Sequence, residues 1–205
     1  MIVILDYGMG NSKSILNMIR KAGGDAKISA EHSDLRQAKA IVLPGVGAFD
    51  NGMRKLDDLG LIPLLSELII EKKVVFLGIC LGMQLLFEKS EEGMLPGLGF
   101  IKGHVSKFKF PVGGKLKVPH MGWNVVHPIS SSGLYESLEN ESRFYFVHSY
   151  FVHCDEIENV MARAFYGNEF TCSVRSGNVY GAQFHPEKSH KFGLTFFKNF
   201  LEIIC

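Results

Sequence analysis

One cysteine stands between two glycines in the stretch Val74-Val75-Phe76-Leu77-Gly78-Ile79-Cys80-Leu81-Gly82. The apolar run before Gly78 predicts a buried strand, and the residues from Leu81 to Phe87 can continue as a helix. A nucleophile at such a strand-to-helix turn lies on a strained elbow, where the residues two positions away must be small. The helix start favours the thiolate, and its free N–H groups can stabilise an oxyanion. Cys80 is a candidate nucleophile, although a buried structural cysteine fits this pattern equally well.

A candidate base lies in Val179-Tyr180-Gly181-Ala182-Gln183-Phe184-His185-Pro186-Glu187, where a strand-like run ends at His185. Pro186 stiffens the turn and pushes the preceding residue towards an extended conformation. The Glu187 carboxylate can then orient the imidazole and stabilise its charged form, which completes a nucleophile–base–orienter set with Cys80. A lone histidine is more often structural, but this combination favours catalysis.

These two segments resemble those of the class I (triad) glutamine amidotransferases, in which Gly-Ile-Cys-Leu-Gly-Met-Gln carries the nucleophile and His-Pro-Glu completes the triad. Four further segments are similar to those of one branch of that family, the glutaminase subunits of imidazole glycerol phosphate synthases: Asp6-Tyr7-Gly8-Met9-Gly10-Asn11, Leu43-Pro44-Gly45-Val46-Gly47-Ala48-Phe49, Pro119-His120-Met121-Gly122-Trp123-Asn124 and His148-Ser149-Tyr150-Phe151. The resemblance extends from the first predicted strand to the last predicted helix, and the set in this order is more specific than any single segment.

The resemblance implies an enzyme that hydrolyses L-glutamine to glutamate and ammonia. Cys80 would attack the side-chain amide, His185 would move the proton, and Glu187 would orient the ring. No metal and no organic cofactor is implied. Because ammonia released into bulk water would be protonated and lost as a nucleophile, the resemblance also implies a synthase partner. That partner would be a cyclase subunit with a (β/α)8 barrel, which forms a heterodimer with this chain in histidine biosynthesis.

Further roles are implied by the resemblance alone. The oxyanion donors would be Val46, Gly47 and Leu81, the substrate contacts would be Gln84, Glu92, His148, Ser149 and Tyr150, and the partner contacts would be Met121, Trp123 and Asn124. Gln84 lies one helical turn beyond Cys80 by i, i+4 spacing. Glu91 competes with Glu92 as the acid that meets the α-ammonium group of glutamine. A surface position, a strand-end role and core packing are the structural alternatives for these side chains.

The loop Pro44–Phe49 is a candidate gate. It places Gly-x-Gly after a strand, as Gly8-Met9-Gly10 does, but a dinucleotide fingerprint needs a third glycine where the chain has Asp50 and Lys13. In the resembling family the loop supplies an oxyanion N–H, and one missing donor costs about 10²–10³ in rate. A loop that turns only when the partner is loaded would therefore gate the reaction. The alternative is a turn that merely ends a strand.

The predicted elements indicate an α/β fold with a central, mostly parallel sheet, helices on both faces and an antiparallel, β-rich C-terminal half. Apolar runs predict strands at 2–5, 26–29, 40–43 and 74–77, with a helix capped by Asn11 or Ser12 and another over 53–73 that breaks near Gly60 and Pro63. Shorter strands are predicted at 103–108, 115–118, 123–126, 144–152, 161–166, 170–174 and 179–184, with a final helix over 191–203. Sites in such sheets form at the carboxyl ends of strands, where distant residues converge.

Length and composition fit one domain spanning residues 1–205. The chain is 46% hydrophobic and 21% charged, with a formal net charge of +1, which gives no global field for nucleic acid. Lys107, Lys109, Lys115 and Lys117 are interpreted as a solvated hairpin. Cys80, Cys154, Cys172 and Cys205 show no metal-type spacing and indicate reduced thiols in a cytoplasm. No signal peptide is expected, and the apolar stretch 74–87 is too short for a membrane span of roughly 20 residues.

Three rival functions fit parts of the pattern. A related glutaminase that feeds a sugar amidotransferase in surface-polysaccharide biosynthesis would share the core motifs and differ in its partner. A cysteine peptidase would share the Cys–His pair but would not need Gln84 or the Pro44 loop. A regulatory subunit with a retired site is disfavoured because Cys80, His185 and Glu187 are all present.

Overall fold

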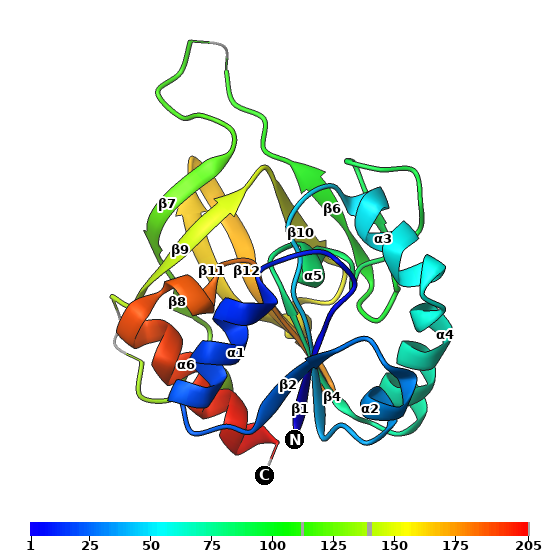
Figure 1. Cartoon of the computed structure of the whole chain (residues 1–205). Coiled ribbons are helices and arrows are strands. Elements are labelled where there is room, and N and C mark those ends of the chain that lie inside the picture. Colours follow the sequence, from blue (N-terminus) through cyan, green and yellow to red (C-terminus); the bar gives the residue numbers. More distant parts are fainter. Residues whose placement is uncertain (112, 139–140, 205) are drawn as a thin grey trace.

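The computed structural model describes residues 1–111, 113–138 and 141–204. Its strands are β1 (Ile2–Leu5), β2 (Ala26–Ser29), β3 (Ala40–Leu43), β4 (Val75–Ile79), β5 (Lys89–Ser90), β6 (Gly103–Lys107), β7 (His120–Val125), β8 (His127–Pro128), β9 (Arg143–His148), β10 (Tyr150–Cys154), β11 (Val160–Tyr166), β12 (Asn168–Ser176) and β13 (Val179–Ala182). Its helices are α1 (Ser12–Lys21), α2 (His32–Arg36), α3 (Phe49–Asp58), α4 (Leu61–Ser66), α5 (Leu81–Gln84) and α6 (His190–Ile203), with a π-helical turn at Glu67–Glu71 and 3-10 turns at Gly133–Tyr135, Ile157–Asn159 and Pro186–Lys188. Figure 1 shows their arrangement.

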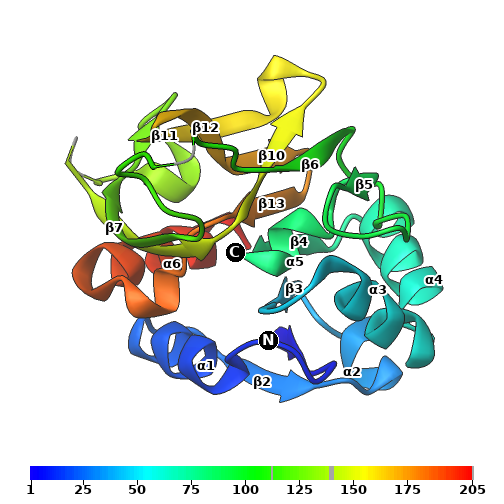
Figure 2. The same cartoon turned by 90° about the horizontal axis from the view of Figure 1, so that it is seen from above.

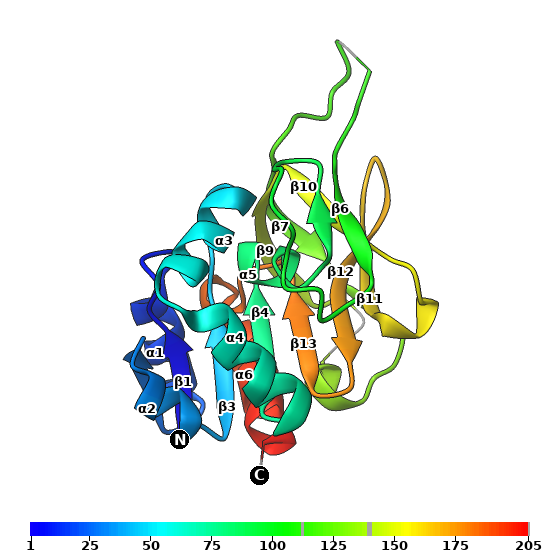
Figure 3. The same ribbon diagram turned by 90° about the vertical axis from the view of Figure 1, so that its right-hand side faces the viewer.

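The main sheet has the strand order β2-β1-β3-β4-β13-β12-β10-β6-β5 in the described part of the chain. Its first five strands pair in parallel, so that β13 returns beside β4 although about a hundred residues separate them. Beyond β13 the pairing turns antiparallel through β12, β10 and β6. Figure 3 shows β1, β4 and β13 pointing the same way. The predicted mostly parallel sheet with an antiparallel C-terminal half is confirmed.

The parallel strands are buried on both faces because their successive side chains point to opposite sides. Ile2 and Ile4 of β1 face a core that α1 and α6 cover, whereas Val3 and Leu5 face a core that α2, α3 and α4 cover. Figure 2 shows these two groups of helices on opposite sides of the sheet. The Asn11 side chain accepts a hydrogen bond from the N–H of Ser14 and caps α1, which selects Asn11 from the two predicted caps, Asn11 and Ser12.

Strands β7 and β9 form a separate antiparallel ribbon. The ribbon reaches the edge of the main sheet at which β4 and β13 end, through an isolated bridge between Tyr145 and His185. Figures 1 and 3 show the described residues between β6 and β7 extending away from the body above this edge. The C-terminal half therefore brings the His185 segment next to the loops that follow β1, β3 and β4.

Some predicted elements are wrong in extent or kind. Residues 115–118 form no strand. The lysine-rich stretch forms no hairpin in its described residues, because β6 ends at Lys107 and residues 113–119 are exposed. The predicted strand 144–152 divides at Ser149, since β9 pairs with β7 whereas β10 pairs with β6 and β12. The helix after Cys80 ends at Gln84, because the following carbonyl groups accept hydrogen bonds from residues 98–101. The break at Gly60 is confirmed, but Pro63 lies inside the first turn of α4.

Candidate active site

Cys80 lies on the expected elbow between β4 and α5. Its backbone has φ 56° and ψ −111°, a conformation that L residues rarely adopt. The two flanking glycines permit this turn through close approach. A Cβ on Gly78 would lie 2.5 Å from the carbonyl oxygen of Gly82, and a Cβ on Gly82 would lie 2.0 Å from the carbonyl oxygen of Leu43. Any larger residue at either position would push the elbow open.

His185 lies immediately beyond β13, and its main chain and ring are held from separate sides. Its N–H donates to the carbonyl oxygen of Tyr145 at 2.8 Å, and the Ser189 hydroxyl donates to its carbonyl oxygen at 2.6 Å. On the ring, Nδ1 lies 2.8 Å from Oε1 of Glu187. The other ring nitrogen, Nε2, is buried and has no hydrogen-bond partner among the described residues. The ring therefore keeps one nitrogen for orientation and one for proton transfer.

The charge state of His185 follows from its neighbours. Burial by itself lowers the pKa of this imidazole, but interactions with Cys80 and Glu187 raise it, and the result is a pKa of about 10. The Glu187 side chain is almost fully buried against the ring, which excludes water from the pair. At neutral pH the site accordingly favours an imidazolium beside the sulfur.

Two other groups contact the sulfur of Cys80. The carbonyl oxygen of Val147 lies 3.9 Å from Sγ, where it can accept a hydrogen bond from the neutral thiol. The Nε2 amide group of Gln183 lies 3.7 Å from Sγ and donates to it. The neutral thiol can therefore donate to Val147, and the thiolate can accept from Gln183. Gln183 is fully buried, and sequence reasoning missed it.

A cavity of about 560 Å³ opens beside the sulfur, a volume within the usual range for small-molecule sites. The residues that line it are Val46, Gly47, Ala48, Cys80, Leu81, Gln84, Glu92, Pro119, Val147, His148, Ser149 and Tyr150. All the residues predicted as oxyanion donors or substrate contacts are in this set. His185 and Glu187 are buried outside the lining, so His185 approaches the sulfur from the protein interior.

The two predicted acid candidates lie in different surroundings. One oxygen of Glu92 accepts a hydrogen bond from the N–H of Phe49 at 2.9 Å, and burial raises the pKa of this carboxyl group although that hydrogen bond lowers it. Glu91 instead accepts from the N–H of Lys107 and pairs with Lys109 on the exposed side. Only Glu92 reaches the cavity.

The loop after β3 is tied to the elbow. The N–H of Leu81, one of the predicted oxyanion donors, donates to the carbonyl oxygen of Gly45 at 3.3 Å. The buried Tyr7 hydroxyl donates to the carbonyl oxygen of Pro44 at 2.7 Å. Gly47 has φ +110°, which favours glycine. In this arrangement a loop carbonyl group, and not a substrate, uses the N–H that follows the nucleophile.

Two more buried histidines lie at the cavity, where His148 is part of the lining and His120 lies behind it. Asn124 Nδ2 lies 3.3 Å from Nε2 of His120, His120 Nδ1 lies 2.9 Å from Nε2 of His148, and His148 Nδ1 lies 2.7 Å from the carbonyl oxygen of Tyr150. Because a carbonyl group can only accept, His148 carries its proton on Nδ1. His148 Nε2 then accepts from Nδ1 of His120, whose Nε2 accepts from the Asn124 amide. Burial lowers the pKa of His120 to about 4 and of His148 to about 3, so both rings are neutral.

The predicted partner residues divide between the surface and the interior. Met121 and Trp123 are 62% and 47% exposed, and the indole of Trp123 stacks on the imidazole of His190. Asn124 points inward, since its amide donates to the carbonyl oxygen of Phe165 as well as to His120. An exposed apolar pair therefore lies on β7, next to an amide that belongs to the histidine network.

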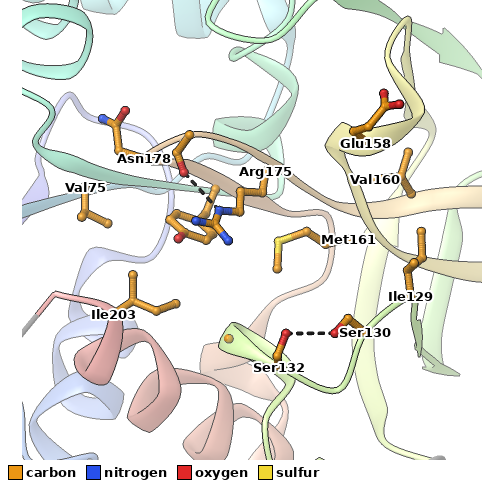
Figure 4. A pocket seen from close by; sticks show the side chains of 13 residues that line it. Val75, Ile129, Ser130, Ser132, Glu158, Val160, Met161, Arg175, Asn178 and Ile203 are labelled. Atoms are coloured by element: carbon orange, nitrogen blue, oxygen red, sulfur yellow. Dashed lines mark hydrogen bonds between the residues drawn. The ribbon is translucent and has the colours of Figure 1, made fainter.

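A larger cavity of about 660 Å³ lies where β4 begins, beside the turn between β12 and β13 (Figure 4). The Arg175 guanidinium lies 5.1 Å from the centre of the Tyr180 ring, and its Nε donates to the carbonyl oxygen of Gly177. The residues that line this cavity include neither a cysteine nor a histidine. Cys80 and His185 lie at the opposite end of these strands, after the carboxyl ends of β4 and β13.

Cys80, Cys154 and Cys172 are free thiols, whereas Cys205 lies outside the described residues. In the described ranges no three His, Cys, Asp or Glu side chains are grouped so that they could hold a metal ion. Across those ranges, too, every helix is too short or too polar to span a bilayer.

The chain is similar over nearly its whole length to known proteins. The glutamine amidotransferase class-I family model matches residues 3–204. Imidazole glycerol phosphate synthase subunit HisH 2 of Methanococcus maripaludis is 51% identical over 98% of this chain and 99% of its own length. Subunit HisH of Bdellovibrio bacteriovorus is 48% identical over 99% of this chain and 100% of its own length. Subunit HisH 2 of Pseudomonas aeruginosa is 46% identical over the full length of both chains.

Solved structures share the fold at lower identity. The crystal structure of a glutamine amidotransferase has a TM-score of 0.72 and 21% identity, and the match covers 100% of this chain and 99% of that one. The structure of PurLQS from Thermotoga maritima has a TM-score of 0.75 and 18% identity, with coverage of 100% and 98%.

Proposed function

The chain belongs to the class I glutamine amidotransferases, and on that premise we propose that it is the glutaminase subunit of an imidazole glycerol phosphate synthase. It hydrolyses L-glutamine and delivers the ammonia to a cyclase subunit in histidine biosynthesis. The observation that carries the proposal is the Cys80–His185–Glu187 array in a chain 46–51% identical, over nearly its full length, to proteins named as that subunit.

The first half of the reaction forms a thioester. The Cys80 thiolate attacks the side-chain amide carbon of glutamine, and a C–S bond forms while the carbonyl oxygen takes the negative charge. When the tetrahedral intermediate collapses, the C–N bond breaks and the His185 imidazolium gives its Nε2 proton to the leaving ammonia. Glu187 holds the ring through Nδ1, which keeps Nε2 directed at the reacting groups.

The second half releases glutamate. Neutral His185 accepts a proton from water, and the resulting hydroxide equivalent attacks the γ-glutamyl thioester carbon. The C–S bond then breaks and Cys80 returns as a thiolate beside the imidazolium. No step calls for a metal or an organic cofactor, because the nucleophile, the base and the orienting acid are all side chains of this chain.

The cavity lining supports a binding mode for free glutamine. Glu92 is the acid that meets the α-ammonium group, since it reaches the cavity while Glu91 binds Lys107 and Lys109. His148, Ser149 and Tyr150 line the same cavity as Val46 and Gly47 of the Pro44 loop.

We further propose that the Pro44–Phe49 loop rests in a closed state. The carbonyl oxygen of Gly45 takes the N–H of Leu81, so turning the peptides of Val46 and Gly47 would free that donor and add a second one. A loaded partner that favours the turned loop would then raise the rate, since each oxyanion donor is worth about 10²–10³ in rate. Met121 and Trp123, both exposed, support a partner surface on β7.

A substitution in the loop tests the gate. Gly47→Val places a β-branched residue at φ +110°, which disfavours this backbone and restricts its turning. We expect partner-stimulated glutamine hydrolysis to fall about 10²-fold, while alkylation of Cys80 by iodoacetamide stays intact. Gly133→Val, also at positive φ with open space around it, is the matched control. Unchanged stimulated turnover in Gly47→Val would refute the gate.

The function itself is tested with the purified chain, first alone and then with the cognate (β/α)8-barrel cyclase, which is supplied with its nucleotide substrate analogue. We expect the cyclase to stimulate glutamine hydrolysis strongly. In Cys80→Ala the stimulated rate should fall by at least about 10³-fold. Cys80→Ala should still support synthase turnover when free ammonia is supplied. Hydrolysis without any response to the cyclase would keep the Cys80 chemistry and assign a different acceptor, a sugar amidotransferase first.

The proposal also places the reaction in the cytoplasm. The three described cysteines are all unpaired thiols, which agrees with a reducing compartment.

A further inference from the structure

Gln183 is the one side chain, apart from the triad, whose polar group contacts the sulfur of Cys80 within the described residues. It follows β13 directly and precedes His185 by two positions, so the same turn that delivers the base also delivers this amide. The side chain is fully buried, and its backbone N–H is already bonded to the carbonyl oxygen of Cys172. A fully buried amide needs hydrogen-bond partners for its oxygen and its NH₂ group, because a buried polar group without a partner costs free energy.

The orientation of this amide is fixed by a chain of hydrogen bonds that starts at a backbone carbonyl group. The oxygen of Tyr150 can only accept, so the Gln84 group that lies 3.2 Å from it must be the NH₂. The same NH₂ of Gln84 lies 3.0 Å from the Gln183 side chain, which must therefore present Oε1. Gln183 then turns its NH₂ towards Cys80 Sγ, at 3.7 Å.

We propose that Gln183 is a further catalytic residue, which donates a hydrogen bond from Nε2 to the Cys80 thiolate, and that Gln84 is the positioning residue that fixes its amide. A donor to an ionised acceptor stabilises it about twice as strongly as it stabilises a neutral one. The neutral thiol gains little from Gln183 because thiol sulfur is a weak acceptor. Gln183 therefore acts with His185 to hold the charged form of the nucleophile.

The arrangement also gives Gln84 a second task besides contact with glutamine. Both N–H groups of its amide are used, one on Tyr150 and one on Gln183. Only its Oε1 is left to face the cavity, so Gln84 offers the substrate an acceptor and no donor. The inference rests on the proposed function only in identifying which nucleophile is being stabilised.

The test measures the rate of Cys80 alkylation by iodoacetamide against pH in the full-length chain. A size-matched substitution, Gln183→Met, removes the donor and keeps the packing. We expect the pH midpoint of alkylation to rise by about one unit, because a hydrogen bond to a charged group is worth about one to two pH units and this one is long. In the presence of the partner, kcat should fall about tenfold while KM stays within about twofold.

Two variants separate the donor from the packing. Gln183→Glu keeps the shape of the side chain but places a carboxylate beside the sulfur. The pH midpoint of Cys80 alkylation should therefore rise further in Gln183→Glu than in Gln183→Met. Asn199→Leu removes another buried amide, which donates to Leu134 and Glu136, and should leave the midpoint in place.

A midpoint within about 0.2 units of the wild-type value in Gln183→Met would overturn the inference. If that variant does not fold, the same lack of shift in Gln183→Glu would overturn it. Neither result would touch the proposed function, which fails if Cys80→Ala keeps glutamine hydrolysis or if the cyclase does not stimulate it.

Discussion

Two sets of buried histidines lie beside the same cavity and reach opposite charge states: His185 is charged, whereas His120 and His148 are neutral. His185 faces Cys80 and Glu187, and its pKa is raised to about 10. His120 and His148 face each other with no carboxylate among their hydrogen-bond partners, and burial lowers their pKa values to about 4 and about 3. Burial lowers the pKa of all three rings, so the partner decides the outcome. Interactions with the Cys80 sulfur and with the Glu187 carboxylate together keep the His185 imidazole charged.

The contrast also assigns different work to the two sets. The charged ring has Nδ1 on Glu187 and leaves Nε2 without a hydrogen-bond partner among the described residues, so that in the proposed mechanism Nε2 can give its proton to ammonia. The neutral rings pass hydrogen bonds in one direction, from Asn124 to the carbonyl oxygen of Tyr150, and hold the wall of the cavity. Because His120 and His148 stay neutral, their network places no second imidazolium beside His185 and Cys80.

The largest expected effect comes from removing the carboxylate. Glu187→Gln keeps a hydrogen-bond acceptor for Nδ1 but loses the charge, so His185 becomes more like His148 and its pKa falls. We expect kcat for stimulated glutamine hydrolysis to fall about 10³–10⁴-fold, as in other triads that lose the orienting charge. Glu91→Gln is the control, since that acid lies outside the cavity. A loss of less than about tenfold in Glu187→Gln would show that the charge is dispensable.

The second-largest effect is expected from adding a carboxylate beside a neutral histidine. His120→Glu gives His148 a carboxylate at Nε2, much as Glu187 serves His185 at Nδ1. We expect the pKa of His148 to rise from about 3 to above its usual value of about 6.5. Titration of the ring followed by NMR measures it. A His148 that stays neutral at pH 6 in the folded variant would mean that burial, and not the partner, sets its charge.

The sequence anticipated the charged pair far better than the neutral one. The glycines around Cys80 and the Pro186 turn after His185 are local patterns with steric reasons, and the structure has both. The link between His120 and His148 joins strands 28 residues apart, and no local pattern encodes it. In the sequence, Gln183 has no feature that distinguishes it from other residues at the end of a strand. Its contact with Cys80 arises only because β13 pairs with β4.

The errors in the fold have the same origin. The stretch 115–118 reads as a strand by composition, but among the described residues it pairs with no strand. The run 144–152 reads as one strand because both halves are rich in aromatic and β-branched residues. Ser149 divides it because the two halves pair in different sheets. Local propensity predicts a strand but not its partners.

A smaller effect is expected in acid. Since the folded pKa values of His120 and His148 lie below the unfolded value of about 6.5, their contribution to stability is complete above pH 6.5 and is lost as pH falls through about 4 and 3. Below pH 6.5 each ring should lower the free energy of unfolding by about 1.4 kcal/mol per pH unit. His148→Gln should make the slope between pH 6 and pH 4.5 shallower by about that amount in urea denaturation. An identical slope would contradict the low pKa of His148.

One measurement tests the central contrast directly: the ¹⁵N chemical shifts of the histidine rings in the folded chain between pH 5 and pH 9. The account predicts that His185 carries protons on both nitrogens throughout this range. It also predicts that His120 and His148 stay neutral, each with its single proton on Nδ1. A neutral His185 at pH 7, or either of the other two rings titrating near pH 6.5, would contradict the account.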